Sequence, residues 1–256
     1  MKFLKDKQTR HDFVTYAMCV VAFAIVFFMQ SNHMIPRMIA GQLVPITAYI
    51  VMAISLNLVV GIAGDLSLGH AGFMSVGAFS GIIAAQSLMD AIPSAAVRLA
   101  VAMIVGAVFA AITGLIVGTP VLRLQGDYLA IVTLAFGEII KELVNCLLVG
   151  WDSRGLHVAL NLTGDKSIAD LGLETEGIAI IKGAQGATST ATISTFTAGF
   201  VLVLITLFVV LNLKDSRAGR AIMALRDNRI AAESVGISAT KYKLMAFVTS
   251  AVLAGA

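Results

Sequence analysis

The stretch Gly64–Gly81 reads GDLSLGHAGFMSVGAFSG and lies inside one of the most apolar parts of the chain. It is rich in glycine, and it also holds an aspartate and a histidine. Gly77 and Gly81 have the Gly-x-x-x-Gly spacing that lets transmembrane helices approach closely, and Gly69 and Gly72 add small surfaces. We predict that these glycines are packing and hinge positions between helices.

The run Gly61–Leu66 at the start of this stretch, GIAGDL, predicts a break in the helix at a place where water or protein satisfies the freed backbone groups. Asp65 is expected to organise the break by capping the restarted helix, accepting a hydrogen bond from the N–H of Ser67 or Leu68. His70 has no second histidine or cysteine nearby. It is therefore expected to be a hydrogen-bonding packing residue rather than a metal ligand.

The composition is that of an integral membrane protein. Apolar residues make up 58% of the chain and charged residues 13%, and the mean hydropathy is +0.92. Soluble domains carry about 25% charged residues. The net charge of +3 is clustered, and no basic stripe with interleaved aromatic residues indicates nucleic-acid binding. Cys19 and Cys146 each lie in an apolar run, so both are expected to be buried apolar residues rather than a disulfide or a metal pair.

Apolar runs of about 20 residues predict spanning helices, because that length crosses about 30 Å of hydrocarbon. Six runs qualify: Phe13–Met29, Met38–Val60, Leu66–Met89, Val97–Leu122, Tyr128–Val149 and Phe196–Leu213. A seventh begins near Leu244 and reaches Ala256, about 20 Å of helix, which is too short to cross. The predicted fold is an all-α polytopic transmembrane bundle, a single domain over residues 1–256 that is expected to be incomplete at its C-terminal end.

Basic residues gather at both ends of the six-span block and predict its orientation. They are Lys2, Lys5, Lys7 and Arg10 before the first run, and Lys214, Arg217, Arg220, Arg226, Arg229, Lys241 and Lys243 after the sixth. Because positively charged loops stay in the cytoplasm, both ends are expected inside, which requires an even number of crossings. The N-terminus is then cytoplasmic. No small-residue cleavage site follows the first run, so it is expected to be a retained helix rather than a signal peptide.

The segment Gly150–Thr195 then lies outside the membrane. It begins with Trp151 and Asp152 and is rich in glycine, threonine and serine. We expect a solvated loop with a short helix or hairpin. The alternative interpretation is a contact surface for an extracellular partner.

Several motifs that carry chemistry are missing from the sequence. There is no G-x-x-x-x-G-K-[ST] phosphate loop, no H-E-x-x-H or C-x-x-C metal spacing, and no G-x-S-x-G nucleophile elbow. The chain is therefore not expected to hydrolyse nucleotide by itself, to need a metal or cofactor, or to act as an enzyme.

The basic segment 214–243 is predicted to form a helix–turn–helix between two spans. One weakly apolar helical face is formed by Ala218, Ala221, Ile222 and Leu225. Asp227 and Asn228 are expected to break and re-cap the chain, and a second short helix would cover Ile230–Val235. Gly236 would end that helix, and Ser238 would cap the next. We interpret the segment as a docking element; the alternative is an ordinary basic loop.

Within this segment, the stretch RIAAESVG at residues 229–236 resembles the cytoplasmic coupling loop of ATP-binding-cassette (ABC) importer permeases. The pattern of that loop is Glu-Ala-Ala, three residues, Gly. Ala231, Ala232 and Gly236 match the pattern, whereas Ile230 stands in place of the glutamate, a departure that is common in one branch of the family. Residues 64–81, 121–140 and 216–247 together resemble that branch, the M-type permease subunit of branched-chain amino-acid uptake systems.

The resemblance covers about Leu43–Phe136 and Asp215–Ala254, and it implies a division of labour. A type I-like importer architecture in the bacterial inner membrane would comprise this permease, a sister permease, two cytoplasmic ATPase subunits and a periplasmic or extracellular substrate-binding protein. Closure of the ATPase pair on ATP would push the coupling element, Asp227–Gly236, and switch the spans between two states. The residues expected to carry this coupling are Arg226, Asp227, Ile230, Ala231, Ala232 and Gly236.

Ionisable residues inside spans are rare and costly, so each calls for a functional hypothesis. Glu138 lies near the middle of the Tyr128–Val149 run and three residues before Lys141, which predicts an ion pair on one helical face. The pair either orders helix packing or lines the pathway and tunes a substrate site. The residues expected at the translocation pathway and helix break are Asp65, Gly69, His70, Gly72, Gly77 and Glu138.

Three alternatives stay open. A channel or secondary carrier could use the same broken helices, with Asp65, His70 or Glu138 as a proton relay, but it would not need the structured basic loop. A membrane enzyme lacks any nucleophile–base or metal spacing. Urea and short-amide permeases have similar motifs, so the substrate class is not decided by these residues.

Overall fold

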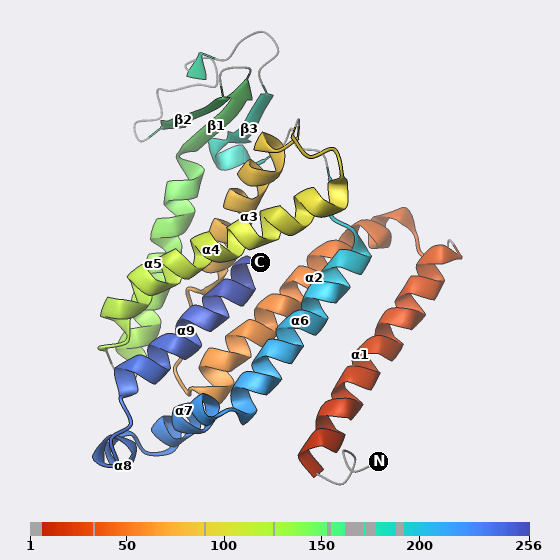
Figure 1. Ribbon diagram of the computed structural model, residues 1–256. Coiled ribbons are helices and arrows are strands. Elements are labelled where there is room, and N and C mark those ends of the chain that lie inside the picture. The colour runs from red at the N-terminus through yellow and green to blue at the C-terminus, as the bar shows by residue number, and fades with distance from the viewer. Residues whose placement is uncertain are drawn as a thin grey trace.

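The computed structural model describes residues 7–32, 34–89, 91–124, 126–152, 155–161, 171–172, 178–187 and 192–256. They form a helical bundle with a small antiparallel sheet at one end (Figure 1). The helices are α1 (Lys7–Ser31), α2 (Arg37–Asn57), α3 (His70–Ser87), α4 (Ala95–Val121), α5 (Asp127–Asn145), α6 (Phe196–Asp215), α7 (Arg217–Asp227), α8 (Arg229–Ser234) and α9 (Ala239–Gly255). A π-helical turn, Leu58–Ile62, continues α2.

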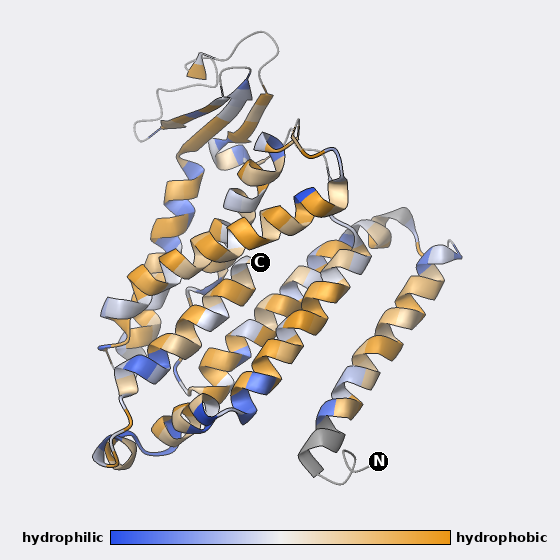
Figure 2. Cartoon of the chain, in the orientation of Figure 1, coloured by the Kyte–Doolittle hydropathy of each residue, from blue (hydrophilic) through white to orange (hydrophobic). Residues whose placement is uncertain are grey.

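Among the described residues, four helical segments are long and apolar enough to span a membrane. They are Asp12–Ser31, Met38–Ile62, Ala95–Val121 and Phe196–Asp215. Hydrophobic residues run along these helices, whereas α7, α8 and the sheet show a mixture of hydrophilic and hydrophobic residues (Figure 2). The chain is therefore a multi-pass helical membrane protein. The other two predicted spans correspond to α3 and α5, which lie in the same bundle but are not among these four segments. The count of six full spans therefore stays a prediction.

The structure confirms the predicted helix break and corrects three helix ends. Residues 63–69 are not helical, so the expected span from Leu66 begins at His70 instead. The last predicted helix begins at Ala239, ahead of Leu244. The expected span Tyr128–Val149 ends as a helix at Asn145, because the chain continues directly into a strand.

That strand belongs to a three-stranded sheet of order β2-β1-β3, formed by β1 (Leu147–Asp152), β2 (Gly155–Leu160) and β3 (Ile178–Lys182). Val149, Ile180 and Ile181 are fully buried and pack against side chains of α3. The expected hairpin is present as β1–β2, but it starts at Leu147. Trp151 and Asp152 therefore lie within a strand and do not open a loop.

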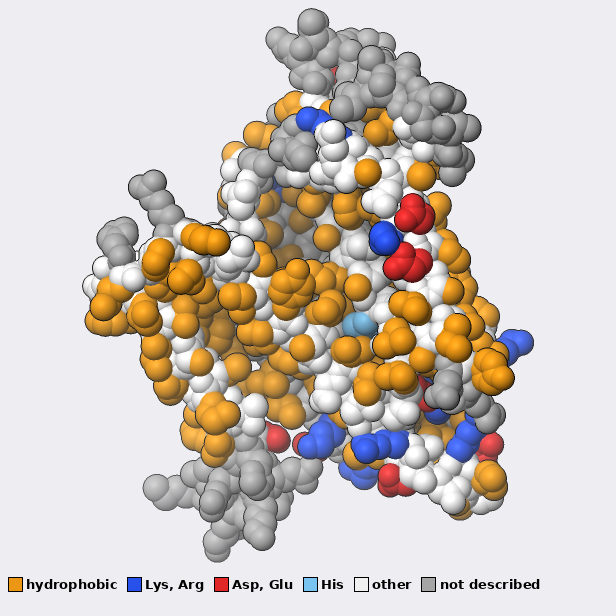
Figure 3. All heavy atoms as spheres, turned by 180° about the vertical axis from the view of Figure 1, so that it is seen from behind, with side chains coloured by type: hydrophobic (Ala, Val, Ile, Leu, Met, Phe, Trp, Pro, Cys, Tyr) orange, Lys and Arg blue, Asp and Glu red, His pale blue; other side chains and the backbone are white. Residues whose placement is uncertain are grey.

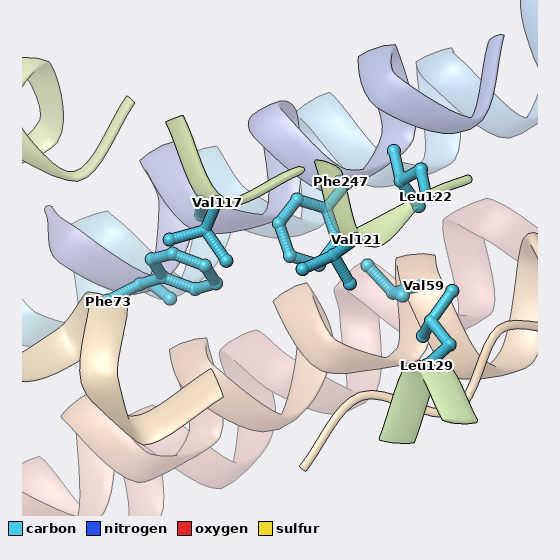
Figure 4. Close-up of a cluster of buried hydrophobic side chains, with 9 residues drawn as sticks. Val59, Phe73, Val117, Val121, Leu122, Leu129 and Phe247 are labelled. Carbon is cyan, nitrogen blue, oxygen red and sulfur yellow. The ribbon is translucent and has the colours of Figure 1, made fainter. Parts of the chain in front are cut away.

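The main core lies where α3, α4 and α9 cross. Phe73 and Phe247 meet edge to face, with ring centroids 5.4 Å apart, and valines of α4 pack beside them (Figure 4). One turn beyond Phe73, a Cβ atom added to Gly77 would lie 2.1 Å from the carbonyl oxygen of Gly255. Close backbone approach is the packing role predicted for Gly77. Its role as a hinge stays a prediction.

Candidate functional site

The α7–α8 element has the local geometry that its sequence predicts. Asn228 leaves the helical conformation after α7, and its side-chain oxygen accepts a hydrogen bond from the Ala231 N–H of α8 at 3.0 Å. Gly236 has a φ of +87°, a left-handed conformation that glycine adopts without strain. Ser238 precedes α9, but its side chain makes no capping hydrogen bond, so that prediction is wrong.

Two large apolar side chains are exposed at α8, one within the helix and one just after it, beside the exposed Arg229–Glu233 ion pair. Ile230 is 82% exposed and Val235 is 75% exposed, whereas Ala232 is buried among residues of α7 and α9. Basic side chains gather at the same end of the molecule (Figure 3), and Asp227 is exposed at the end of α7. Large exposed apolar side chains rimmed by charge are typical of a surface that binds another protein.

Arg226 attaches α7 to the helix break. Its Nη1 donates a hydrogen bond to the carbonyl oxygen of Gly61, in the π-helical turn that ends α2. The methylene groups of the same side chain lie beside Gly64, where an added Cβ would come within 2.7 Å of them. Sequence reasoning singled out Arg226 for coupling but did not identify this partner.

Asp65 does not cap α3, which corrects the prediction. Its Oδ1 instead forms an ion pair with Nζ of Lys243 in α9, and the two side chains are only 13% and 16% exposed. The N–H of Leu68 donates to Oγ1 of Thr133 at 3.1 Å. Because α3 begins only at His70, the side chain of Asp65 lies too far back along the chain to reach its first free N–H groups.

His70 is a buried hydrogen-bonding residue, as predicted. Its Nε2 lies 3.3 Å from Oγ of Ser55 and 2.9 Å from Oγ of Ser250. Both hydroxyl groups donate to backbone carbonyls, of Met52 and Ser55 respectively. We therefore assign the ring proton to Nε2, which donates to Oγ of Ser250, with Oγ of Ser55 as a more distant second acceptor. The contact joins α2, α3 and α9.

The start of α3 lies directly on α5. A Cβ atom added to Gly69 would lie 1.9 Å from the carbonyl oxygen of Thr133, and one added to Gly72 would lie 3.3 Å from Cα of Gly137. The predicted small surfaces at Gly69 and Gly72 are thus contacts with α5. They fix the separation of the two helices at this level.

A cavity of about 440 Å³ lies between α3 and α5. Its lining residues are Leu68, Gly69, Ala71, Gly72, Ser75, Phe79, Leu134, Gly137, Glu138, Lys141, Val144, Asn145, Gly183, Ala184, Gln185 and Gly186. The last four form a turn just after β3. The volume falls within the range of about 300–1,000 Å³ that is usual for small-molecule sites.

Two charged side chains line this cavity. Oε2 of Glu138 and Nζ of Lys141 are 2.7 Å apart, which confirms the predicted ion pair, and the side chains are 58% and 59% exposed. Acidic and basic groups lie together within an otherwise largely apolar region of this face (Figure 3). In the described ranges, no group of three or more His, Cys, Asp or Glu residues is placed to hold a metal ion.

The break, the cavity and the α7–α8 element can be compared with known proteins. Two proteins named high-affinity branched-chain amino acid transport system permease protein LivM are similar to this chain. The Salmonella typhimurium protein is 38% identical over 151 residues, which cover 57% of this chain and 35% of that protein. The Escherichia coli protein is 36% identical over 157 residues, which cover 59% and 36%. The match thus spans about a third of the length of these relatives.

The comparison with solved structures found no match. The family model described as branched-chain amino acid transport system / permease component matches residues 38–256, which is most of the chain and includes the break, the cavity and the α7–α8 element. This chain belongs to the family of branched-chain amino acid transport system permease components.

Proposed function

We propose that this chain is the transmembrane permease subunit of an ABC importer for branched-chain amino acids. It would lie in the bacterial inner membrane with its N-terminus in the cytoplasm, in a type I-like architecture of six full spans followed by α9. The observation that carries the proposal is the exposure of the large apolar side chains Ile230 and Val235 at α8, in a chain whose family match runs across this helix. ATP hydrolysis would occur on partner chains, and this subunit would not itself be an enzyme.

The coupling element docks on one of two cytoplasmic ATPase subunits. Ile230 inserts its exposed side chain into that partner, beside the charged end of α7 at Asp227. The N–H of Ala231 donates to the capping side chain of Asn228. The buried Ala232 and the left-handed Gly236 stabilise the conformation of the turn. A sister permease and an extracytoplasmic substrate-binding protein complete the assembly.

Movement of α7 reaches the pathway through the helix break. Arg226 holds the carbonyl of Gly61, and Asp65 holds the same non-helical segment to α9. Gly69 and Gly72 set the distance between α3 and α5 beside the cavity. In this proposal Gly77 and His70 are the packing contacts about which α3 moves, and Glu138 lines the pathway.

Uptake into vesicles tests the proposal. The protein is produced with its candidate ATPase, permease and binding-protein partners and reconstituted, and labelled leucine and labelled urea are offered with and without ATP. We expect ATP-dependent accumulation of leucine. Accumulation of leucine without ATP or partners would indicate a secondary carrier, and preference for urea would indicate an amide permease; either result refutes the proposal.

Docking is tested by substitution on α8. Ile230→Asp places a charge in the apolar contact, and Gly236→Arg places a side chain at a left-handed backbone position. Both variants are expected to lose copurification of the ATPase subunits and leucine uptake. Thr240→Asp, which introduces the same charge at an exposed residue in the first turn of α9, is the matched control and is expected to retain both.

A further inference from the structure

The cavity between α3 and α5 opens to the surface along α5, where Glu138 and Lys141 are more than half exposed. One end is formed by Leu68 and Gly69, immediately before the start of α3. The other end is bounded by the turn after β3. The cavity therefore extends from the helix break to the sheet.

The ion pair in this cavity is not saturated. Glu138 and Lys141 are joined by one contact of 2.7 Å, while more than half of each side chain stays exposed. A carboxylate accepts about four hydrogen bonds and an ammonium group donates three, so both retain bonding capacity. An exposed pair of this kind contributes little to stability, so stability alone does not explain two charged side chains on a helix of a membrane protein.

The rest of the lining provides an apolar surface beside the charges. Leu68 is 52% exposed and Leu134 is 46% exposed, and Phe79 and Val144 also line the cavity. A branched aliphatic side chain of a ligand would cover this surface and remove it from water. Opposite charges and an apolar wall thus lie within one small volume.

We propose that this cavity binds a zwitterionic amino acid with an apolar side chain, Glu138 receiving the α-ammonium group and Lys141 the α-carboxylate. The inference rests on the proposed function and adds the substrate subsite to it. The ligand exchanges one ion pair for two, so every charge stays compensated. Urea carries no charge with which to replace the pair, and a cationic or anionic side chain would place an uncompensated charge on the apolar wall.

Protection of an introduced thiol tests the site directly. Ser75 lines the cavity, so Ser75→Cys is made in a background of Cys19→Ser and Cys146→Ser. The complete transporter in vesicles is treated with N-ethylmaleimide without ATP, and the labelling rate of this chain is measured. The ligands offered are leucine, leucinamide, 4-methylpentanoate and urea. If the Ser75→Cys protein does not assemble, Ala71→Cys reports on the same cavity.

Leucine is expected to slow the labelling. Leucinamide, which lacks the carboxylate, and 4-methylpentanoate, which lacks the ammonium group, should each need at least about a tenfold higher concentration, because each loses one charge-assisted contact. Urea should give no protection. This comparison leaves the pair intact, so it does not depend on how a variant of the pair folds.

Variants of the pair provide the second measurement. Glu138→Gln and Lys141→Met should each raise the leucine concentration for half-protection by about tenfold or more. Glu142→Gln is the comparison variant: Glu142 is exposed on the same helix and acts on the charge of Lys141 but does not line the cavity, so it should shift the half-protection concentration much less than Glu138→Gln. Absence of leucine protection, equal protection by all four ligands, or protection unchanged in Glu138→Gln and Lys141→Met would overturn the proposal.

The cavity assignment and the proposed function can fail separately. ATP-dependent uptake of leucine by the unsubstituted protein, measured in the same preparation, distinguishes the two failures. If uptake occurs while the introduced thiol is not protected, the cavity assignment fails and the proposed function stands. If no ATP-dependent uptake occurs with all partners present, the proposed function itself fails.

Discussion

Replacing Asp65 by asparagine should cost far more stability than the same change at Glu138. Both residues form an ion pair with a lysine, but the Asp65 and Lys243 side chains are 13% and 16% exposed, against 58% and 59% for Glu138 and Lys141. Removing one partner of a buried pair costs about 3–5 kcal/mol, because the other charge is left uncompensated. Because some exposure remains, we expect Asp65→Asn to lower the free energy of unfolding by about 3 kcal/mol. Glu138→Gln should lower it by less than about 1 kcal/mol.

Unfolding of the protein in mixed micelles by increasing SDS, followed by the loss of helical circular dichroism, measures both changes. Lys243→Met should match Asp65→Asn, since each single variant leaves one buried group unpaired. The double variant Asp65→Asn/Lys243→Met removes both charges and should fall several kcal/mol short of the sum of the two single losses. Additive losses, or equal losses for Asp65→Asn and Glu138→Gln, would refute the view that Asp65 and Lys243 form a buried, mutually dependent pair.

Three further changes have expected outcomes. Gly77→Val must separate α3 from α9, because a Cβ there lies 2.1 Å from the carbonyl oxygen of Gly255, and should lower stability by about 1–3 kcal/mol in the same titration; an unchanged midpoint would contradict this packing. Asn228→Ala removes the cap of α8 and should weaken it by about 1 kcal/mol, seen as faster amide exchange over 229–234 with α2 unaffected. Ser250→Ala removes both the 2.9 Å contact to Nε2 of His70 and the hydrogen bond that Ser250 donates to the carbonyl of Ser55, so it should cost about 1–3 kcal/mol; no loss would mean that neither contact adds stability.

Features with a local cause could be predicted from the sequence. The helix break follows from glycines and a polar residue within a few positions, and the structure places non-helical backbone at 63–69. The end of α7, the cap from Asn228 and the left-handed turn at Gly236 likewise depend on neighbours within one helical turn. The Glu138–Lys141 pair is of the same kind, because residues three apart share a helical face.

Features that depend on distant segments could not be predicted. The nearest donors along the chain, the N–H groups of Ser67 and Leu68, favour a cap by Asp65, whereas its partner Lys243 lies 178 residues away and reaches it only because α9 packs against the break. The continuation of α5 into β1 has a related cause. A short apolar run such as Leu147–Val149 suits a helix or a strand, and the choice is made by pairing with β2 and β3.

The most consequential of these distant contacts lie on one short segment. Between Gly61, held by Arg226, and Gly69, whose backbone touches that of Thr133, the chain has no regular helix after Ile62 to absorb a displacement. A shift of α7 must therefore either break the contact at Gly61 or move residues 63–69 with it. Because Gly69 lies against α5, such movement changes the separation of α3 and α5, which is the width of the cavity. The α7–α8 element could then alter the cavity through residues 63–69, provided that the Asp65–Lys243 pair, which ties this segment to α9, shifts or breaks with it.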